Sequence, residues 1–223
     1  MKEAVIVAGA RTPVGKAKKG SLAQTRPDDL AAHTIKETLK RAGDYKGTID
    51  DVIIGCAVPE AEQGMNMARN IAALAGLNKE VPGITINRYC SSGLQSIAFA
   101  AERIMVGASE AIIAGGTESM SLIPITGHVM KPNPKLVEEA SEYYMTMGHT
   151  AEEVAKRFSI SREVQDRFAA ESHHRASKAI KEGKFEEEIV PVEVTEQIVN
   201  EHHAIETRTY FFEQDEGVRP DTT

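Results

Sequence analysis

Residues 84–96 read Ile-Thr-Ile-Asn-Arg-Tyr-Cys-Ser-Ser-Gly-Leu-Gln-Ser, and they hold the complete pattern of a strand that turns into a helix. A short apolar run at 84–86 leads through small and polar residues into a helical stripe that ends at Gly107 and consists of Leu94, Ile97, Ala101 and Ile104. Strands that pass directly into helices are the repeating unit of α/β proteins. The stretch therefore predicts a β-α unit with Cys90 in its turn.

The neighbouring segments repeat this unit. Further short apolar runs at 4–8, 52–54 and 111–114 predict strands, and helices are expected after Pro27 and over 66–75. Repeated units of this kind favour a mostly parallel sheet with helices packed on it, within a mixed α/β fold. We expect residues 1–117 to form this core.

The pattern changes beyond the predicted core. Three prolines (Pro124, Pro132 and Pro134) mark an irregular stretch, which indicates a boundary. A capping-box pattern, Thr150 with Glu153, predicts the start of one helix, and Ser161 predicts the cap of a longer one. β-like runs follow at 189–194 and 207–212. We expect a second, mostly helical domain over 118–223, inserted into a larger protein and incomplete at its end.

Composition excludes several classes of protein. Hydrophobic residues make up 41% and charged residues 26%, which is typical of globular domains. The net charge of -7 argues against a surface that binds nucleic acid. We find no apolar run near the roughly 20 residues that span a bilayer, so no membrane insertion is expected. Two cysteines are too few for a disulfide framework, and a cytoplasmic location is predicted.

Cys90 is the candidate nucleophile. It lies near the expected first turn of a helix, where unpaired N–H groups and the helix dipole favour a thiolate, the reactive form of cysteine. Ligands also bind at the carboxyl ends of parallel strands. The alternative is a cysteine that packs as a small apolar side chain, and this interpretation is preferred for Cys56 at the end of an apolar run.

The segment 87–96 resembles the nucleophile segment of the thiolase family, in particular of its degradative 3-ketoacyl-CoA type. Other segments resemble the same family in the same order: 8–13 with Gly15, 63–69, 115–121, 147–152 and 189–192. The resemblance extends over essentially the whole chain. It implies a thiolase-fold N-terminal half over 1–117 and most of an inserted domain that binds coenzyme A over 118–223.

The resemblance also implies an activity and its residues. Cys90 would accept an acyl group as a thioester, which coenzyme A then attacks, in an acyl-CoA:acetyl-CoA C-acyltransferase of fatty acid degradation. Met147 would lie along the pantetheine arm and Arg219 near the nucleotide end; otherwise Met147 fills the core and Arg219 is solvated. Acyl-CoA and coenzyme A are the implied partners, with coenzyme A as a substrate and no covalently bound cofactor. A homo-dimer or tetramer is implied.

The sequence departs from the family pattern at three places. Thiolases also use an Asn-Glu-Ala-Phe segment, a Gly-His-Pro segment and a second cysteine near the C-terminus, and we find none of these here. Residues 200–203, Asn-Glu-His-His, are assigned to a solvated loop. The adjacent His173 and His174 would point to different faces of a helix, so no metal site is predicted. We interpret the chain as lacking the C-terminal half and expect negligible turnover from it alone.

Three alternatives stay open. Within the family, the short-chain acetoacetyl-CoA enzyme is the second choice after the 3-ketoacyl-CoA type. A β-ketoacyl-carrier-protein synthase also uses a cysteine at a strand-to-helix turn, although Met147 and Arg219 in a long insertion argue against it. The third is a non-catalytic half-protein that binds acyl-CoA.

Overall fold

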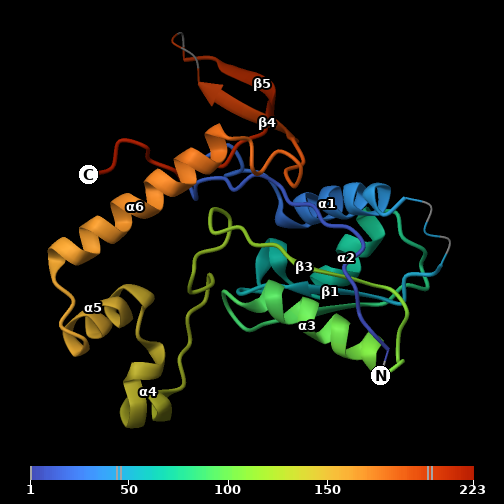
Figure 1. The fold of residues 1–223 in the computed structure, drawn as a ribbon, viewed down its shortest axis with the longest axis horizontal. Coiled ribbons are helices and arrows are strands. Elements are labelled where there is room, and N and C mark those ends of the chain that lie inside the picture. Colours follow the sequence, from blue (N-terminus) through green and yellow to red (C-terminus); the bar gives the residue numbers. More distant parts are fainter. Residues whose placement is uncertain (1, 44, 46, 200, 202) are drawn as a thin grey trace. The chain divides into compact units, whose positions relative to one another are not determined.

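The computed structural model describes residues 2–43, 45, 47–199, 201 and 203–223 (Figure 1). Asn200 and His202, in the loop predicted at 200–203, lie outside the described residues. The chain packs into two compact units: Met1–His128 with Glu188–Gly217, and Val129–Glu187 with Val218–Thr223. These units are defined by packing alone. The predicted division between residues 117 and 118 separates a core from a domain that binds coenzyme A, and it stays a prediction.

The sheet of the first unit has three parallel strands in the order β2-β1-β3. Their bounds are β1 (Asp51–Gly55), β2 (Gly83–Ile86) and β3 (Ile112–Gly116). The register sets Gly55, the last residue of β1, opposite Ile86 of β2 and Gly116 of β3. The predicted strands at 52–54, 84–86 and 111–114 are confirmed, and all three end at the same edge of the sheet.

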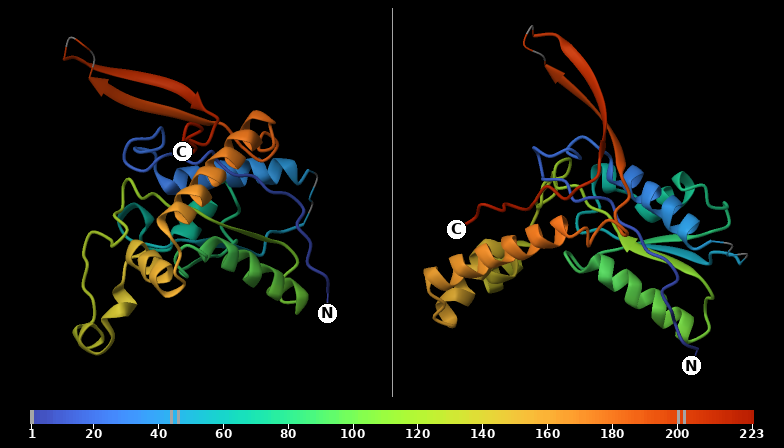
Figure 2. Two further views of the ribbon diagram at one scale, coloured as in Figure 1. Left: turned by 60° about the vertical axis from the view of Figure 1, so that its left-hand side comes forward. Right: turned by 45° about the horizontal axis from the view of Figure 1, so that its top comes forward.

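Helices cover both faces of this sheet (Figures 1 and 2). On one face α2 (Met67–Leu74), preceded by the short helix η1 (Ala61–Gln63), packs on the strands, and α1 (Pro27–Arg41) packs on α2. On the other face lies α3 (Ser92–Met105). The buried cluster of α1 and α2 includes Val52 and Ile54, while Ile53, which points to the opposite face, is buried outside that cluster.

The predicted strand at 4–8 is wrong. Val5, Ile6 and Val7 are exposed by 68%, 83% and 71%, and in the described chain no strand is assigned to this run. Just before this run, the Lys2 N–H donates to the Met105 carbonyl at 3.1 Å. An apolar run predicts burial, but a strand also requires a neighbour that pairs with its N–H and C=O groups, and this neighbour is not specified by the run.

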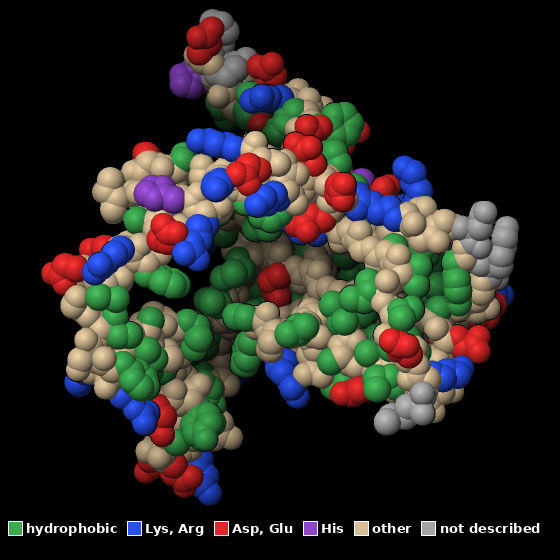
Figure 3. Space-filling view, in the orientation of Figure 1, with side chains coloured by type: hydrophobic (Ala, Val, Ile, Leu, Met, Phe, Trp, Pro, Cys, Tyr) green, Lys and Arg blue, Asp and Glu red, His purple; other side chains and the backbone are tan. Residues whose placement is uncertain are grey.

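Hydrophobic side chains reach the surface of both units in Figure 3.

The two β-like runs predicted near the end of the chain are strands, and they pair as a hairpin, which was not predicted. β4 (Val192–Val199) pairs antiparallel with β5 (Ile205–Phe212). Its apolar end forms a second small core, which consists of Val192, Val194 and Phe212 packed with Leu22, Leu30 and Tyr210. Chain segments far apart in sequence thus share one core.

Carboxylates after the hairpin fasten the loop at 11–21. The Asp215 carboxylate accepts two hydrogen bonds from the Arg11 guanidinium, at 2.8 and 3.1 Å, and one from the N–H of Val14. The Glu216 carboxylate accepts the N–H groups of Lys16 and Ser21. Burial raises the pKa of Asp215, but the bonds from Arg11 and Val14 outweigh it and hold that pKa below its ordinary value.

The second unit is helical. It holds α4 (Pro134–Ala140), η2 (Ser141–Tyr144), α5 (Met147–Arg157) and α6 (Arg162–Lys181). Ser161 caps α6 as predicted, because its side chain accepts the Val164 N–H. The predicted capping box at Thr150 is wrong: Thr146 caps α5, and the Thr150 hydroxyl instead donates to the Thr146 carbonyl inside the helix.

Candidate functional site

The sheet brings three chain turns to one edge. Because β1, β2 and β3 are parallel, the segments that follow them meet at their carboxyl ends. Cys56 and Ala57 follow β1, Asn87 follows β2, and Glu118 comes two residues after β3. Cys90, the predicted nucleophile, lies between β2 and α3 and is exposed. Its place at a strand-to-helix turn agrees with the prediction from sequence. Its catalytic role stays a prediction.

Short polar contacts shape the Cys90 turn. Tyr89 has a φ of 46°, in the left-handed region that a bulky side chain rarely adopts. The buried Ser92 hydroxyl accepts the Arg88 N–H at 2.7 Å and donates to the Tyr89 carbonyl at 2.6 Å. The Ser91 hydroxyl donates to the Arg88 carbonyl at 2.9 Å. Ser91 and Ser92 therefore help to hold the turn that carries Cys90.

Glycines let the start of α3 lie directly on the sheet. A Cβ on Gly55 would lie 2.3 Å from the carbonyl carbon of Ser92 and 2.5 Å from the nitrogen of Gly93. A Cβ on Gly116 would lie 3.2 Å from the Cα of Gly93. These approaches set the height of the helix start, and therefore of Cys90, above the ends of the strands.

Cys56 is buried in a polar network instead of facing the open edge. Its thiol lies 3.8 Å from the Glu118 carboxylate and 3.4 Å from the amide nitrogen of Gln63, which also donates to that carboxylate. Burial first, and the negative charge of Glu118 second, raise the pKa of the Cys56 thiol to about 12. A thiol in this state is a poor nucleophile at neutral pH, which agrees with its predicted structural role.

The two cysteines are expected to differ sharply toward iodoacetamide. With a pKa of about 12, only about one Cys56 thiol in 10⁴ is ionised at pH 8, and it is also shielded from the reagent. We expect Cys90 to be alkylated at least about 100-fold faster than Cys56. Peptide mass mapping over a time course measures both rates in one sample. Equal rates would contradict the structure of this edge.

The other two predicted site residues belong to the second unit. Met147 is the first residue of α5 and is exposed. Arg219 lies against α6: its backbone N–H donates to Nδ1 of His173 at 3.1 Å, and its guanidinium lies 3.2 Å from Nε2 of the same ring. The prediction that His173 and His174 form no metal site stays a prediction, although in the described part of the chain no group of three His, Cys, Asp or Glu side chains gathers as a metal site would require.

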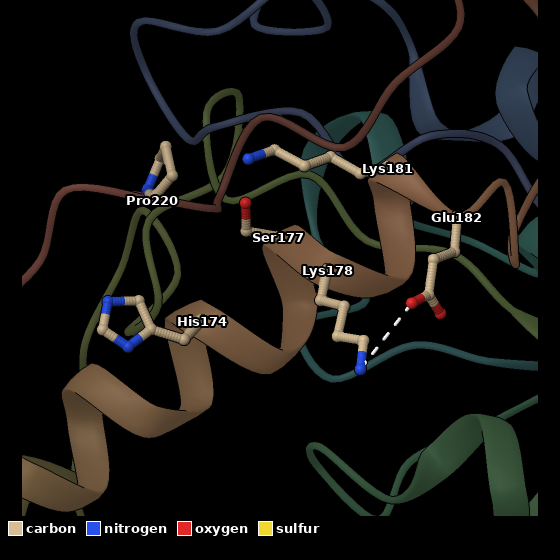
Figure 4. Close-up of a pocket in the computed structure, with 6 residues that line it drawn as sticks. All are labelled: His174, Ser177, Lys178, Lys181, Glu182 and Pro220. Carbon is tan, nitrogen blue, oxygen red and sulfur yellow. Dashed lines mark ion pairs between the residues drawn. The ribbon is translucent and has the colours of Figure 1, made fainter.

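A shallow hollow of about 450 Å³ lies along α6 (Figure 4). It is lined by His174, Ser177, Lys178, Lys181, Glu182 and Pro220. Lys178 is paired with Glu182 at 3.7 Å, and Lys181 extends across the hollow in Figure 4. Two lysines, Lys178 and Lys181, and one carboxylate, Glu182, therefore lie around the hollow.

Sequence reasoning missed three residues at the sheet edge. Asn87, Glu118 and Gln63 make the hydrogen bonds that join the strand ends, and none of them was predicted as a site residue. The available signal was their position, because Asn87 is a polar residue directly after one apolar strand and Glu118 comes two residues after another. Their partners depend on strand register, which the sequence pattern does not supply.

Comparison with known proteins identifies the family. The sequence model described as "Thiolase, N-terminal domain" matches residues 4–223. The chain is 68% identical over 223 residues to a 3-ketoacyl-CoA thiolase of Bacillus subtilis (strain 168), covering all of this chain and 57% of the relative. It is 40% identical to a 3-ketoacyl-CoA thiolase of Vibrio vulnificus (strain CMCP6), again over the whole chain and 56% of the relative.

The chain thus spans just over half the length of the curated relatives it matches. The matched region includes the parallel sheet, its covering helices and the Cys90 turn, so the predicted fold class is confirmed. Since the family model covers nearly every residue, the chain belongs to the thiolase family, over the part of these proteins described as the N-terminal domain.

Proposed function

We propose that the complete protein is a 3-ketoacyl-CoA thiolase, an acyl-CoA:acetyl-CoA C-acyltransferase, and that this chain supplies its acyl-accepting cysteine. The observation that carries the proposal is the exposed Cys90 at the ends of parallel strands, in a chain 68% identical to a protein named 3-ketoacyl-CoA thiolase. Cys56, the other cysteine, is buried and has a raised pKa, which leaves Cys90 as the thiol suited to the reaction.

In this proposal the Cys90 thiolate attacks the 3-keto carbon of a 3-ketoacyl-CoA. The bond between carbons 2 and 3 breaks, the acyl chain stays on sulfur as a thioester, and the two-carbon carbanion takes up a proton and leaves as acetyl-CoA. The thiolate of coenzyme A then attacks the thioester, acyl-CoA departs, and Cys90 regains its thiolate. Sulfur serves both steps because it is a soft nucleophile and a good leaving group.

Proton transfer and oxyanion stabilisation require groups that this sequence does not contain. The Asn-Glu-Ala-Phe and Gly-His-Pro segments and the second cysteine of the family pattern are absent from its 223 residues. Loss of one oxyanion donor alone lowers rates by about 10²–10³. We therefore expect negligible thiolysis from these residues by themselves.

Coenzyme A is proposed to bind along the second unit. Met147 would contact the pantetheine arm and Arg219 the nucleotide end. Support for the role of Arg219 comes from its neighbourhood: the following residue, Pro220, lines the hollow together with Lys178 and Lys181. Lysine and arginine side chains suit the phosphates of a nucleotide.

Location, assembly and pathway are part of the same proposal. We place the protein in the cytoplasm as a homo-dimer or tetramer that acts in fatty acid degradation. The helices in the described ranges lack the combination of length and apolar character needed to cross a bilayer. The net charge of -7 supports a small-molecule substrate in preference to nucleic acid.

Thiolysis by the protein expressed from its complete reading frame tests the proposal. We expect cleavage of acetoacetyl-CoA and of a longer 3-ketoacyl-CoA, each dependent on added coenzyme A, with initial rates that show ping-pong kinetics. An acyl group on a carrier protein serves as the control substrate and should not react. Reaction with the carrier-protein thioester alone would favour a β-ketoacyl synthase and contradict the proposal.

A further inference from the structure

A continuous row of hydrogen bonds joins the three strand ends to the Cys90 turn. The Glu118 carboxylate, after β3, accepts the N–H of Ala57 at 2.6 Å. The carbonyl of Ala57, after β1, accepts from the side-chain amide of Asn87 at 2.9 Å. The side-chain oxygen of Asn87, after β2, accepts the N–H of Tyr89 at 2.8 Å. Asn87 thus holds β1 with one end of its side chain and the turn with the other.

The residue that Asn87 holds is the one in the unusual conformation. Tyr89 directly precedes Cys90 and has its φ at 46°, where residues other than glycine persist only when their surroundings fix them. Its N–H bond to Asn87 fixes one side, and its carbonyl bond to Ser92 fixes the other. The direction in which the chain enters Cys90 therefore depends on both side chains.

These two side chains act differently. Ser92 belongs to α3 and is buried, and among the described residues its hydroxyl bonds to Arg88 and Tyr89 of the turn. Asn87 is the member that ties the turn to β1, through Ala57. Without it, the turn would keep its internal bonds but lose this tie to the sheet edge.

We infer that Asn87 is a positioning residue for the Cys90 nucleophile, which it holds in register with the ends of β1 and β3 through the Ala57 peptide. The inference rests on the proposed function of Cys90. Asn87 needs no contact with substrate for this role. Its loss would displace the sulfur relative to the rest of the site, and a displacement of about 1 Å in such a group can lower the rate about 100-fold.

Two substitutions at Asn87 separate its two bonds. Asn87→Ala removes both bonds. In Asn87→Ser the hydroxyl can still accept the Tyr89 N–H, because serine forms the same local turn more weakly. The serine side chain is too short to reach the Ala57 carbonyl, so the second bond is lost. The matched control is Asn70→Ala, which truncates an exposed asparagine on α2. All variants are made in the protein expressed from its complete reading frame. Thiolysis of acetoacetyl-CoA by coenzyme A gives kcat and KM, and a melting curve gives Tm.

We expect kcat of Asn87→Ala to fall about 100-fold with KM changed less than about twofold, because the chemical step loses its geometry while binding remains. Asn87→Ser should regain part of kcat, and Asn70→Ala should match the wild type. If Asn87→Ala does not fold, Asn87→Ser alone decides, with a kcat clearly below the wild-type value expected.

Three results would overturn the inference. The first is a kcat of Asn87→Ala equal to that of Asn70→Ala, and the second is a wild-type kcat in Asn87→Ser, since the bond to Ala57 would then contribute nothing. The third is a rise in KM and a fall in Tm that together account for the lost activity, which indicates a structural role only. The wild type and Cys90→Ser are assayed alongside. If the wild type shows no thiolysis, or if Cys90→Ser keeps full activity, the proposed function is refuted and the inference with it. The three results for the Asn87 variants leave the proposed function intact.

Discussion

Replacing Cys90 by serine is expected to reduce thiolysis by at least about three orders of magnitude in the complete protein. A hydroxyl does not ionise near neutral pH, so the attacking group is lost, and an ester releases its acyl group to coenzyme A less readily than a thioester does. The side chain is exposed, so the replacement should leave Tm nearly unchanged. The measurement is kcat/KM with acetoacetyl-CoA, supported by mass analysis of the trapped protein.

The mass analysis supplies the control for this variant. After mixing with a 3-ketoacyl-CoA in the absence of free coenzyme A, the wild type should carry the acyl mass on the peptide that contains Cys90. The peptide that contains Cys56 should remain unmodified in both proteins, because its thiol is buried and its pKa is raised. Normal activity in Cys90→Ser, or an acyl mass on Cys56, would refute the proposed nucleophile.

Replacing Gly55 by alanine is expected to destabilise the protein by about 3 kcal/mol, at the upper end of the usual cost of overpacking. The new Cβ would lie 2.3 Å from the Ser92 carbonyl carbon and 2.5 Å from the Gly93 nitrogen. Both are backbone atoms, which cannot rotate away as a side chain can. The start of α3 must therefore move off β1. Because Cys90 lies only two residues before this helix start, kcat should fall as well.

Gly115→Ala is the matched control. Gly115 lies in the neighbouring strand β3, one position before the partner of Gly55, yet a Cβ there meets no atom within 4 Å. Its free energy of unfolding in urea should stay within about 0.5 kcal/mol of the wild-type value. Similar losses in the two variants would show that the close approach of α3 to β1 contributes little.

The strands around Cys90 were predictable because their apolar runs are short, complete and followed by glycine or polar residues. The same reasoning failed at 4–8, where the apolar pattern is equally good but the described chain provides no pairing strand. Periodicity reports which side chains favour burial, and it carries no information about partners. The capping-box pattern misplaced the start of α5, because Thr146 and Thr150 are equally plausible caps in sequence and only the fold selects one.

The candidate site was predictable in part for a similar reason. Cys90 could be found because a strand-to-helix turn is a local pattern. The role of Asn87 could not, because it depends on the Ala57 carbonyl 30 residues away, which the parallel register brings within 2.9 Å. Likewise the close approach of Gly55 to Ser92 is a property of packing between two elements, and in sequence a glycine at the end of a strand is equally typical of a simple turn.

The fastening of the loop at 11–21 by Asp215 and Glu216 has a consequence for biosynthesis. Glu216 is separated by 195 residues from Ser21, whose hydroxyl it binds at 2.7 Å. At translation rates of about 5–20 residues per second, the ribosome needs roughly 10 to 40 s to make the intervening chain. During that interval the early loop lacks its carboxylate partners, so it can complete its contacts only after Asp215 and Glu216 have been made.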